Sequence, residues 1–508
     1  MSKKKKKKSK PKKNPRILVV TPEITYLPNG MGNMANLLTA KGGGLADVSA
    51  TLVSNLFEQG ADVHVALPHY RKMFSIDVGK FINEKLRMYK SKLPDERIHL
   101  AEDRAFYYRE QVYDGYQQEN INASLVFQRE VINNIIPRVR PDLIHCNDWM
   151  TGLIPAMSRR LNIPCLFTVH NIHTLKISLE RIEYTGIDAA EFWQYLFFDQ
   201  IPQNYEESRS FNAVDLLTSG VFAAHYINTV SPTFLKEVVN GQHSSIHGTV
   251  RSEFTNKSKA GYAAGVLNSP DPSYTPVNDK ALACTFNARN HARGKLANKQ
   301  QLQEHLGLIR DDKAPLFFWP SRLDPVQKGC QLLTNILYRV VSRYWKDHLQ
   351  VVVVANGSYQ QHFHDVVRLH DFYKRVSVCD FDEQLSRLSY AASDFILMPS
   401  LFEPCGLPQM IGQLYGSIPI AHDTGGIHDT VSPLDCSRDS GNGFLFQHFN
   451  NSGLSWAIDQ AMAYYKQPEA TKKKQVTRIM KESSATFNCS VTARHYMDIY
   501  EKLLAKPM

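Results

Sequence analysis

The sequence predicts an α/β protein with two doubly wound domains. Three observations lead to this prediction: short apolar segments alternate with helical ones, the apolar segments are hydrophobic almost throughout, and a proline-rich segment divides them into two sets. Alternating strands and helices are typical of βα units and parallel sheets. Continuously apolar strands are typical of sheets that are covered on both faces. At 508 residues the chain also exceeds the usual size of a single core.

The strand candidates share a short run of β-branched or other apolar residues that ends in polar residues. They are 16–23, 61–68, 142–148, 165–171 and 226–232 in the first half, and 314–323, 349–357, 375–381, 394–400, 418–424 and 443–449 in the second. The clearest helical patterns lie between them, at 49–60, 330–341, 383–393 and 407–416.

The segment LNSPDPSYTPVND, residues 267–279, has the proline, serine and asparagine content of a linker. We therefore expect one Rossmann-like domain over residues 15–270 and a second over residues 271–486. In such sheets ligands bind beyond the carboxyl ends of the strands. Two facing domains would place the ligand in the cleft between them.

The net charge of +10 comes almost entirely from one terminal segment. Residues 1–14, MSKKKKKKSKPKKN, hold nine lysines and no acid, and without them the net charge is +1. A run of like charges repels itself, so we expect a disordered tail and no nucleic-acid partner. The tail lacks the apolar region of a secretory signal, and no segment has the ~18 apolar residues of a membrane span. The eight cysteines form no CxxC motif, so reduced thiols and a cytoplasmic location are expected.

The segment KGGGLADV, residues 41–48, places three glycines between a predicted strand and a predicted helix. Glycine allows close backbone approach, and the N–H groups at a helix start attract anions. Lys41 beside them favours a phosphate site. Taken alone, a plain flexible loop explains the glycines equally well, because neither Walker-A nor GxGxxG spacing is present.

Polar clusters follow five of the predicted strands, at the edge where a ligand is expected. They are 145–153, His170 with Asn171, Ser321 with Arg322 and Lys328, Glu403 with Cys405 and Gly406, and Thr424 with Gly425 and Gly426. Arg322 and Lys328 suit a diphosphate. Glu403 suits sugar hydroxyls or a positive charge at an anomeric carbon. The set indicates transfer of a group from a nucleoside diphosphate.

Two other patterns are typical of metal sites. Asp380-Phe381-Asp382 is a DxD triplet, but it ends a buried-looking strand and is interpreted as a loop feature. His243 and His247 share one helix face, but no glutamate follows the first histidine as in HExxH. We expect no protein-bound metal.

Several motifs resemble those of bacterial glycogen synthases and plant starch synthases. KGGGLADV is similar to their KxGGLxDV signature, and HCNDWMTGL, FTVHNI, SRLDPVQKG, SLFEPCGLPQM and DTGGIHDTV follow in family order from about residue 16 to residue 502. The resemblance implies a GT-B fold with two Rossmann-like domains facing across a cleft. It also implies retaining transfer of glucose from ADP-glucose or UDP-glucose to the non-reducing end of glycogen or another α-glucan, with no cofactor.

The resemblance also implies roles for individual residues. Glu403 and His170 would be catalytic, next to the transferred glucose. The last residues, 487–508, would form a helix that crosses back to the first domain. The substrate-binding set would comprise Lys41, Gly43, Gly44, Asp47, Asn268, Arg322, Lys328, Tyr390, Cys405, Gly406, Leu407, Thr424 and Gly425, with Gly42 as the variable glycine. Lys41, Arg322 and Lys328 would hold the diphosphate, and Tyr390 would lie against the base.

The sequence departs from the family pattern at several points. Asn268-Ser269-Pro270-Asp271 stands where NG(I/V)D is usual, Arg322 and Lys328 are six residues apart rather than five, and His422-Asp423 replaces a basic pair. Two alternatives therefore stay open: a non-catalytic glucan-binding relative, and a GT-B transferase with a lipid or other acceptor.

Overall fold

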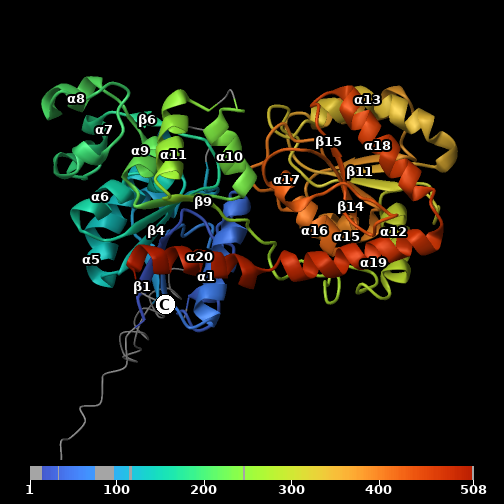
Figure 1. The fold of residues 1–508 in the computed structure, drawn as a ribbon, viewed down its shortest axis with the longest axis horizontal. Coiled ribbons are helices and arrows are strands. Elements are labelled where there is room, and N and C mark those ends of the chain that lie inside the picture. The colour runs from blue at the N-terminus through green and yellow to red at the C-terminus, as the bar shows by residue number, and fades with distance from the viewer. Residues whose placement is uncertain (1–13, 33, 75–96, 114–116, 244–245, 506–508) are drawn as a thin grey trace, which may run out of the picture. The chain divides into compact units, whose positions relative to one another are not determined.

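The computed structural model describes residues 14–32, 34–74, 97–113, 117–243 and 246–505 (Figure 1). By their internal contacts these residues form two compact units. The first unit runs to Ile227 and includes the chain from Ala493 onward, and the second runs from Asn228 to Thr492. The predicted lysine tail lies outside the described residues apart from Asn14. The predicted domain limits at 270/271 and 486/487 stay predictions.

One sheet has seven strands in the order β3-β2-β1-β4-β5-β8-β9. Its strands are β1 (Arg16–Val20), β2 (Asp62–Pro68), β3 (Ile98–Ala101), β4 (Leu143–Asn147), β5 (Cys165–Val169), β8 (Tyr226–Thr229) and β9 (Ala263–Gly265). The pairs β2–β3, β1–β2, β1–β4 and β4–β5 are parallel. Residues 17–20 of the inner strand β1 are completely buried, as a strand covered on both faces requires.

The first unit contains mostly short helices. They are α1 (Gly44–Glu58), α3 (Arg104–Tyr107), α4 (Gln117–Glu130), α5 (Ile136–Val139), α6 (Ile154–Arg160), α7 (Leu179–Tyr184), α8 (Tyr205–Phe211) and α9 (Leu216–Ala223), and a small antiparallel pair joins β6 (Lys176–Ile177) to β7 (Val214–Asp215). The first unit also includes most of the last helix, α20 (Cys489–Leu504), from Ala493 onward. There the Tyr500 hydroxyl lies 2.8 Å from His145 Nδ1, so this helix is fixed to β4.

A second sheet has six strands in the order β12-β11-β10-β13-β14-β15, and all five pairings are parallel. The strands are β10 (Leu316–Trp319), β11 (Gln350–Val354), β12 (Val376–Cys379), β13 (Phe395–Met398), β14 (Ile418–His422) and β15 (Phe444–Phe446). The helices of the second unit are α10 (Pro232–Asn240), α11 (Gly248–Lys259), α12 (His291–His305), α13 (Cys330–Arg343), α14 (Gln360–Leu369), α15 (Glu383–Ala392), α16 (Pro408–Leu414), α17 (Gly425–Thr430), α18 (Asn451–Tyr465) and α19 (Glu469–Thr486).

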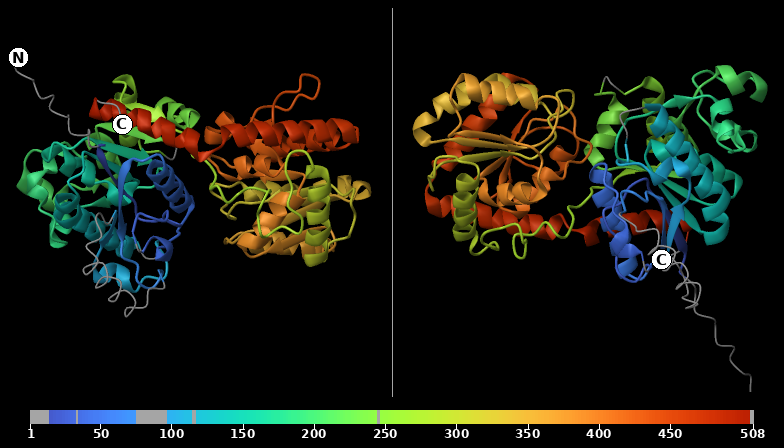
Figure 2. Two further views of the ribbon diagram at one scale, coloured as in Figure 1. Left: turned by 90° about the horizontal axis from the view of Figure 1, so that it is seen from below. Right: turned by 180° about the vertical axis from the view of Figure 1, so that it is seen from behind.

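Helices cover both faces of the six-stranded sheet (Figure 2). Phe317 on β10 belongs to a core cluster that includes buried residues of α13 and α18. Its neighbour Phe318 belongs to another cluster, with residues of α12 and α15. Successive side chains of a strand point to opposite faces, so this strand must be apolar at every position.

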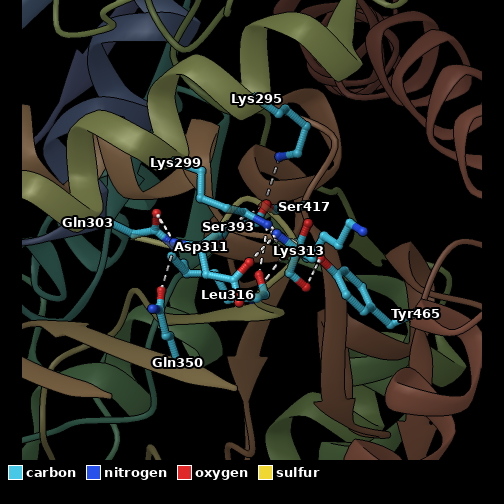
Figure 3. Close-up of polar contacts among 12 residues, drawn as sticks. Lys295, Lys299, Gln303, Asp311, Lys313, Leu316, Gln350, Ser393, Ser417 and Tyr465 are labelled. Carbon is cyan, nitrogen blue, oxygen red and sulfur yellow. Dashed lines mark hydrogen bonds and ion pairs between the residues drawn. The ribbon is translucent and has the colours of Figure 1, made fainter. Parts of the chain in front are cut away.

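Figure 3 shows a polar network at the amino-terminal edge of this sheet. Lys299 of α12 donates to Asp394 Oδ2 at 2.7 Å, next to β13, and to the Ala314 carbonyl at 3.0 Å. The Nζ of the buried Lys295 donates to the carbonyls of Ala391 and Tyr415, each at 3.1 Å. Burial lowers the pKa of Lys295 to about 7. These lysines connect helices to strand starts, and they lie at the edge opposite to the one where ligands are expected.

The predicted α/β fold is confirmed, since all eleven predicted strands form. The sequence reading missed β3 and β9 of the seven-stranded sheet and the two-residue strands β6 and β7. All eight cysteines are free thiols. Nowhere in the described part of the chain is there a helix long and apolar enough to cross a membrane.

Candidate active site

The glycine loop lies at the carboxyl edge of the first sheet, between β1 and α1. Helix α1 begins at Gly44, and Gly43 is its N-cap. Lys41 Nζ lies 2.9 Å from Asp47 Oδ2, and the other Asp47 oxygen accepts from the Thr25 hydroxyl at 2.6 Å. The structure thus pairs two residues of the predicted binding set, Lys41 and Asp47, with each other.

The N–H groups of this loop point at a carboxylate of the protein itself. Gly42 and Gly43 both donate to Glu23 Oε2, at 2.8 Å for Gly43, and the Tyr113 hydroxyl donates to Glu23 Oε1 at 3.2 Å. Glu23 is 1% exposed, and this burial raises the pKa of its carboxyl group. The predicted phosphate cradle is therefore filled by Glu23. Sequence reading missed this residue because it ends a predicted strand and belongs to no recognised motif.

The first two glycines also differ in the space around them. A Cβ on Gly42 would lie 2.7 Å from the Tyr113 ring, whereas a Cβ on Gly43 would meet nothing closer than Glu23 at 4.0 Å. Contacts of 2.7 Å do not occur for real Cβ atoms, so the ring would have to move. Gly42, which the sequence reading treated as the variable glycine, is the sterically constrained one.

Asp148 follows β4 in an unusual conformation. Its φ of 57° and ψ of −179° lie in a region that residues other than glycine rarely adopt. Its Oδ1 accepts from the backbone N–H groups of His170 at 2.7 Å and Asn171 at 3.3 Å. Burial nevertheless raises the pKa of Asp148 to about 7. The strained backbone and the shifted pKa mark Asp148 as a functional candidate. The HCNDWMTGL motif contained it, but its role was not inferred.

His170 lies beside Asp148 at the end of β5. Its Nε2 is 2.9 Å from Asn147 Oδ1, an acceptor, so Nε2 carries the proton. Burial lowers the pKa of His170 to about 3. The imidazole is therefore neutral near pH 7 and can hydrogen-bond a hydroxyl group, but it does not act as a cationic acid. His145 lies in the same motif, but it is completely buried between Tyr500 and Thr168 in the core.

In the second unit, two cations follow β10. Arg322 is exposed, and in the described part of the chain its guanidinium makes no hydrogen bond or ion pair. Lys328 Nζ lies 2.6 Å from Glu403 Oε2, which also accepts from the Ser400 hydroxyl at 3.0 Å. Glu403 is 6% exposed. An ammonium group has three donors, so Lys328 can bind Glu403 and an anionic ligand together.

Two loops of this edge pack backbone against backbone. The Gly426 N–H donates to the Glu403 carbonyl at 2.9 Å. Gly425 has a φ of +48°, and a Cβ there would lie 2.0 Å from the same carbonyl. Glycine is therefore required at Gly425 for both conformation and space. This contact holds the loop that contains Glu403 against the loop that contains Thr424, and both loops carry predicted binding residues.

A further carboxylate, Glu237 on α10, contacts the second loop. Its Oε1 accepts from the Gly425 N–H at 2.8 Å and lies 3.3 Å from the Thr424 hydroxyl, while His243 Nε2 is 2.8 Å from Oε2. Burial alone would raise the pKa of Glu237, but the hydrogen bonds from His243 and Gly425 bring it below its usual range. No pattern in the sequence indicates this contact, because Glu237 and Gly425 are 188 residues apart.

Asn268 lies against Cys405. Both side chains are buried, and in the described residues Asn268 Oδ1 has no hydrogen-bond donor. A buried acceptor without a donor is costly and is often completed by water or a ligand. Burial raises the pKa of Cys405 to about 12, so its thiol is not reactive and the residue contributes its backbone.

Tyr390 does not reach the edge of the sheet. It is 4% exposed, and its ring packs edge-on against Phe318 at 5.0 Å between centroids. Phe381, directly after β12, is 53% exposed at the carboxyl edge. Asp382, the second acid of the DxD triplet, caps α15 by accepting from the Leu385 N–H at 2.7 Å. Phe381 is therefore an aromatic side chain of this edge that a ligand can reach.

The strand order arranges these groups in a row along the edge. Phe381 follows β12, Arg322 follows β10, Glu403 follows β13 and Thr424 follows β14. Neighbouring strands are ~4.8 Å apart. The row thus runs from an aromatic ring through two cations to a buried carboxylate, which matches in order the base, diphosphate and sugar of a nucleotide sugar.

Known proteins resemble this chain over most of its length. Residues 16–252 match the family described as the starch synthase catalytic domain, and residues 314–463 match the glycosyl transferases group 1 family. A glycogen synthase from Moorella thermoacetica is 31% identical over 519 residues, covering 97% of each chain. One from Syntrophotalea carbinolica is 30% identical over 492 residues, covering 91% of this chain and 96% of the other.

Among solved structures, the catalytic domain of starch synthase IV from Arabidopsis thaliana, bound to ADP and acarbose, aligns with a TM-score of 0.78. Its sequence identity is 26%, and the alignment covers 97% of this chain and all of the other. The two glycogen synthases are near 30% identical to this chain over almost its whole length. The fold is GT-B, and the protein belongs to the glycogen synthase and starch synthase family of glycosyltransferases.

Proposed function

We propose that this glycosyltransferase acts in the cytoplasm, where it transfers glucose from ADP-glucose to the non-reducing end of an α-1,4-glucan with retention of configuration. The observation that carries the proposal is the row Phe381, Arg322, Lys328 and Glu403 along one sheet edge. The relatives of this chain are glycogen synthases, and the starch synthase IV structure contains ADP and acarbose. ADP-glucose is therefore the expected donor, and UDP-glucose is the alternative to be tested.

In this proposal the diphosphate lies over the end of β10. The exposed guanidinium of Arg322 supplies paired donors. Lys328 stays paired with Glu403 and uses another of its N–H groups to bind a phosphate oxygen. The nucleobase stacks on Phe381. Stacking on a phenyl ring does not distinguish adenine from uracil strongly, which is why the donor must be determined by experiment.

The glucose unit lies beside Glu403 and Asn268. Glu403 accepts from sugar hydroxyl groups, and a further hydroxyl supplies the donor that Asn268 Oδ1 lacks. In the reaction the bond between C1 and the phosphate oxygen breaks, and a bond forms from C1 to the acceptor O4. The acceptor proton moves to the departing phosphate oxygen, so no protein base is needed. Arg322 and Lys328 stabilise the charge that develops on the diphosphate.

The first unit contributes groups that suit neutral hydroxyls. Asp148 and Glu23 are buried carboxyl groups with raised pKa values, and His170 is a neutral imidazole. A buried carboxyl group accepts hydrogen bonds, and a neutral imidazole both donates and accepts them. We therefore assign this edge to the glucan rather than to the phosphates.

The test is incorporation of radiolabelled glucose into glycogen from ADP-glucose and, separately, from UDP-glucose, with Glu403→Ala as the inactive control. We expect incorporation from ADP-glucose that the control variant lacks. Incorporation from UDP-glucose alone would correct the donor and keep the reaction. If neither donor labels the polymer, the chain is a non-catalytic relative or uses another acceptor.

A further inference from the structure

A groove at the other end of the same sheet edge has no role in the proposed transfer. It has a volume of about 670 Å³, which is within the usual range for ligand sites, and lies at the carboxyl end of β15. Its walls come from the end of α17, from the residues after β15 and from α18. The lining residues that matter here are Asp423, His428, Phe446, Gln447, His448 and Trp456.

Trp456 presents a large flat surface to this groove. It lies on α18 and is 54% exposed, although an indole usually becomes buried when it serves only the core. Buried apolar residues such as Phe446, which is 2% exposed, form the floor. An exposed aromatic ring beside a groove is a common mark of a binding surface.

The polar groups of the groove suit a neutral ligand with many hydroxyls. His428 Nδ1 lies 2.7 Å from Asp423 Oδ1, so this pair is held in place at the rim. The exposed side chains of Gln447 and His448 make no hydrogen bond within the described part of the chain. No lysine or arginine lines the groove. A phosphate or polynucleotide would need such cations, whereas a sugar needs an apolar face and mixed donors and acceptors.

The position of the groove identifies the sugar. Along the edge, the proposed nucleotide sugar extends from Phe381, which follows β12, to Glu403, which follows β13. Asp423, which lines the groove, follows the next strand, β14. The groove therefore begins next to the glucose end of the row, on the side away from the nucleobase. A chain of glucose units is the ligand that continues in this direction.

We propose that the Trp456 groove is a second carbohydrate site, which holds a segment of an α-1,4-glucan by stacking one glucose ring on the indole. This inference rests on the proposed function, because the identity of the ligand as a glucan comes from that proposal. The site retains the polymer and takes no part in bond breaking. Its effect falls on the binding of long glucans and not on the binding of the donor.

The test uses the full-length protein and maltoheptaose. Titration calorimetry and the KM for glycogen are measured for the wild type, Trp456→Ala, Trp456→Phe and Tyr373→Ala. Since one stacked aromatic ring contributes about 1 kcal/mol, Trp456→Ala should weaken maltoheptaose binding and raise the KM for glycogen about five-fold, with the donor KM within two-fold of the wild type. Trp456→Phe should recover part of the loss. Tyr373 is 55% exposed on the same unit but outside the groove, and its substitution should change neither value.

Two outcomes would overturn the inference: equal maltoheptaose affinity in Trp456→Ala and wild type, or an equal loss in Tyr373→Ala. The failure of the proposed function is a separate result. An enzyme that transfers no glucose but binds maltoheptaose through Trp456 refutes the transfer and keeps the groove. An active enzyme with Trp456-independent binding refutes the groove alone. Unchanged melting temperatures of the variants exclude an effect through folding.

Discussion

The carboxyl edges of the two sheets carry glycine-containing loops of similar appearance that are used differently. In the first unit, the N–H groups of Gly42 and Gly43 are taken by the buried carboxyl group of Glu23, and Lys41 is paired with Asp47. In the second unit, Arg322 is exposed at the edge and Lys328 has donors to spare beside Glu403. A glycine loop next to a lysine is thus not by itself a phosphate site.

The difference assigns two kinds of chemistry to the two units. The first edge holds carboxyl groups with raised pKa values and a neutral histidine, which suit hydroxyl groups. The second edge holds unneutralised positive charge, which suits a diphosphate. Substitutions in the first unit should therefore change stability and its pH dependence, and substitutions in the second should change nucleotide binding and turnover.

The largest effect is expected at Glu403. Replacing it with glutamine keeps the shape but leaves Lys328 without its anionic partner and removes the negative charge beside the proposed position of the sugar. Turnover in the radiolabel assay should fall by about 100-fold or more. Glu383→Gln, at an exposed carboxylate on α15 of the same unit, is the matched control and should retain wild-type turnover. A loss below five-fold would remove Glu403 from the reacting centre.

Asp148 should govern a pH dependence of stability that belongs to the first unit. Its folded pKa of about 7 lies above the value of an unfolded aspartate, so its contribution to stability is complete below about pH 4 and is lost as the pH rises towards 7. Asp148→Asn cannot titrate. Relative to the wild type, this variant should gain on the order of 2 kcal/mol between pH 4 and pH 8.

Calorimetric melting of the wild type and of Asp148→Asn at pH 5 and at pH 8 checks this prediction. The difference between their melting temperatures at pH 5 must differ from that at pH 8. Asp188→Asn, at an exposed position of the same unit, serves as the control. A gap that is the same at both pH values would show that Asp148 does not titrate in this range.

Arg322→Ala should weaken the binding of ADP without changing the fold, because the side chain is exposed and makes no contact that the fold needs. The expected loss is about 20-fold in Kd, the effect of removing one charge-assisted contact. Titration calorimetry with ADP measures it. Arg339→Ala, at an exposed arginine on α13, should bind as the wild type does. Unchanged affinity in Arg322→Ala would place the diphosphate elsewhere.

A smaller loss is expected at Phe381. Removing the ring in Phe381→Ala should raise the Kd for ADP about five-fold, the lower end of the range for base stacking at an exposed ring. The informative comparison is Tyr390→Leu, which removes the aromatic ring that the sequence had indicated. Tyr390 is buried against Phe318, so its variant should bind ADP normally. The reverse result would restore Tyr390 as the base contact.

The smallest effect distinguishes neighbouring glycines. A methyl group at Gly42 collides with Tyr113, so Gly42→Ala should cost about 1 kcal/mol and lower the melting temperature by about 3 °C. At Gly43 the space is open, and Gly43→Ala should melt within one degree of the wild type. Equal melting temperatures would mean that the Tyr113 ring moves freely.

Sequence reasoning succeeded where the signal is local. Apolar runs marked the strands, because a strand inside a covered parallel sheet is apolar at every position. Sequence reasoning indicated Tyr390 as the base contact, and that assignment stays a prediction. The structure shows that the Tyr390 ring is buried and the Phe381 ring is exposed, a difference that an alternating pattern does not reveal. Sequence reasoning missed Glu23 and Glu237 because each acts through a backbone N–H that lies far away in sequence.

By itself, the sequence determined the α/β class, the parallel strands and the motifs that place the chain in its family. These properties depend on hydrophobic periodicity and on short segments whose meaning is local. Only the tertiary structure decided which N–H groups are occupied, which carboxyl groups are buried and which aromatic rings face outward. Those properties depend on desolvation and on partners from distant segments, and both are set when the strands assemble into sheets.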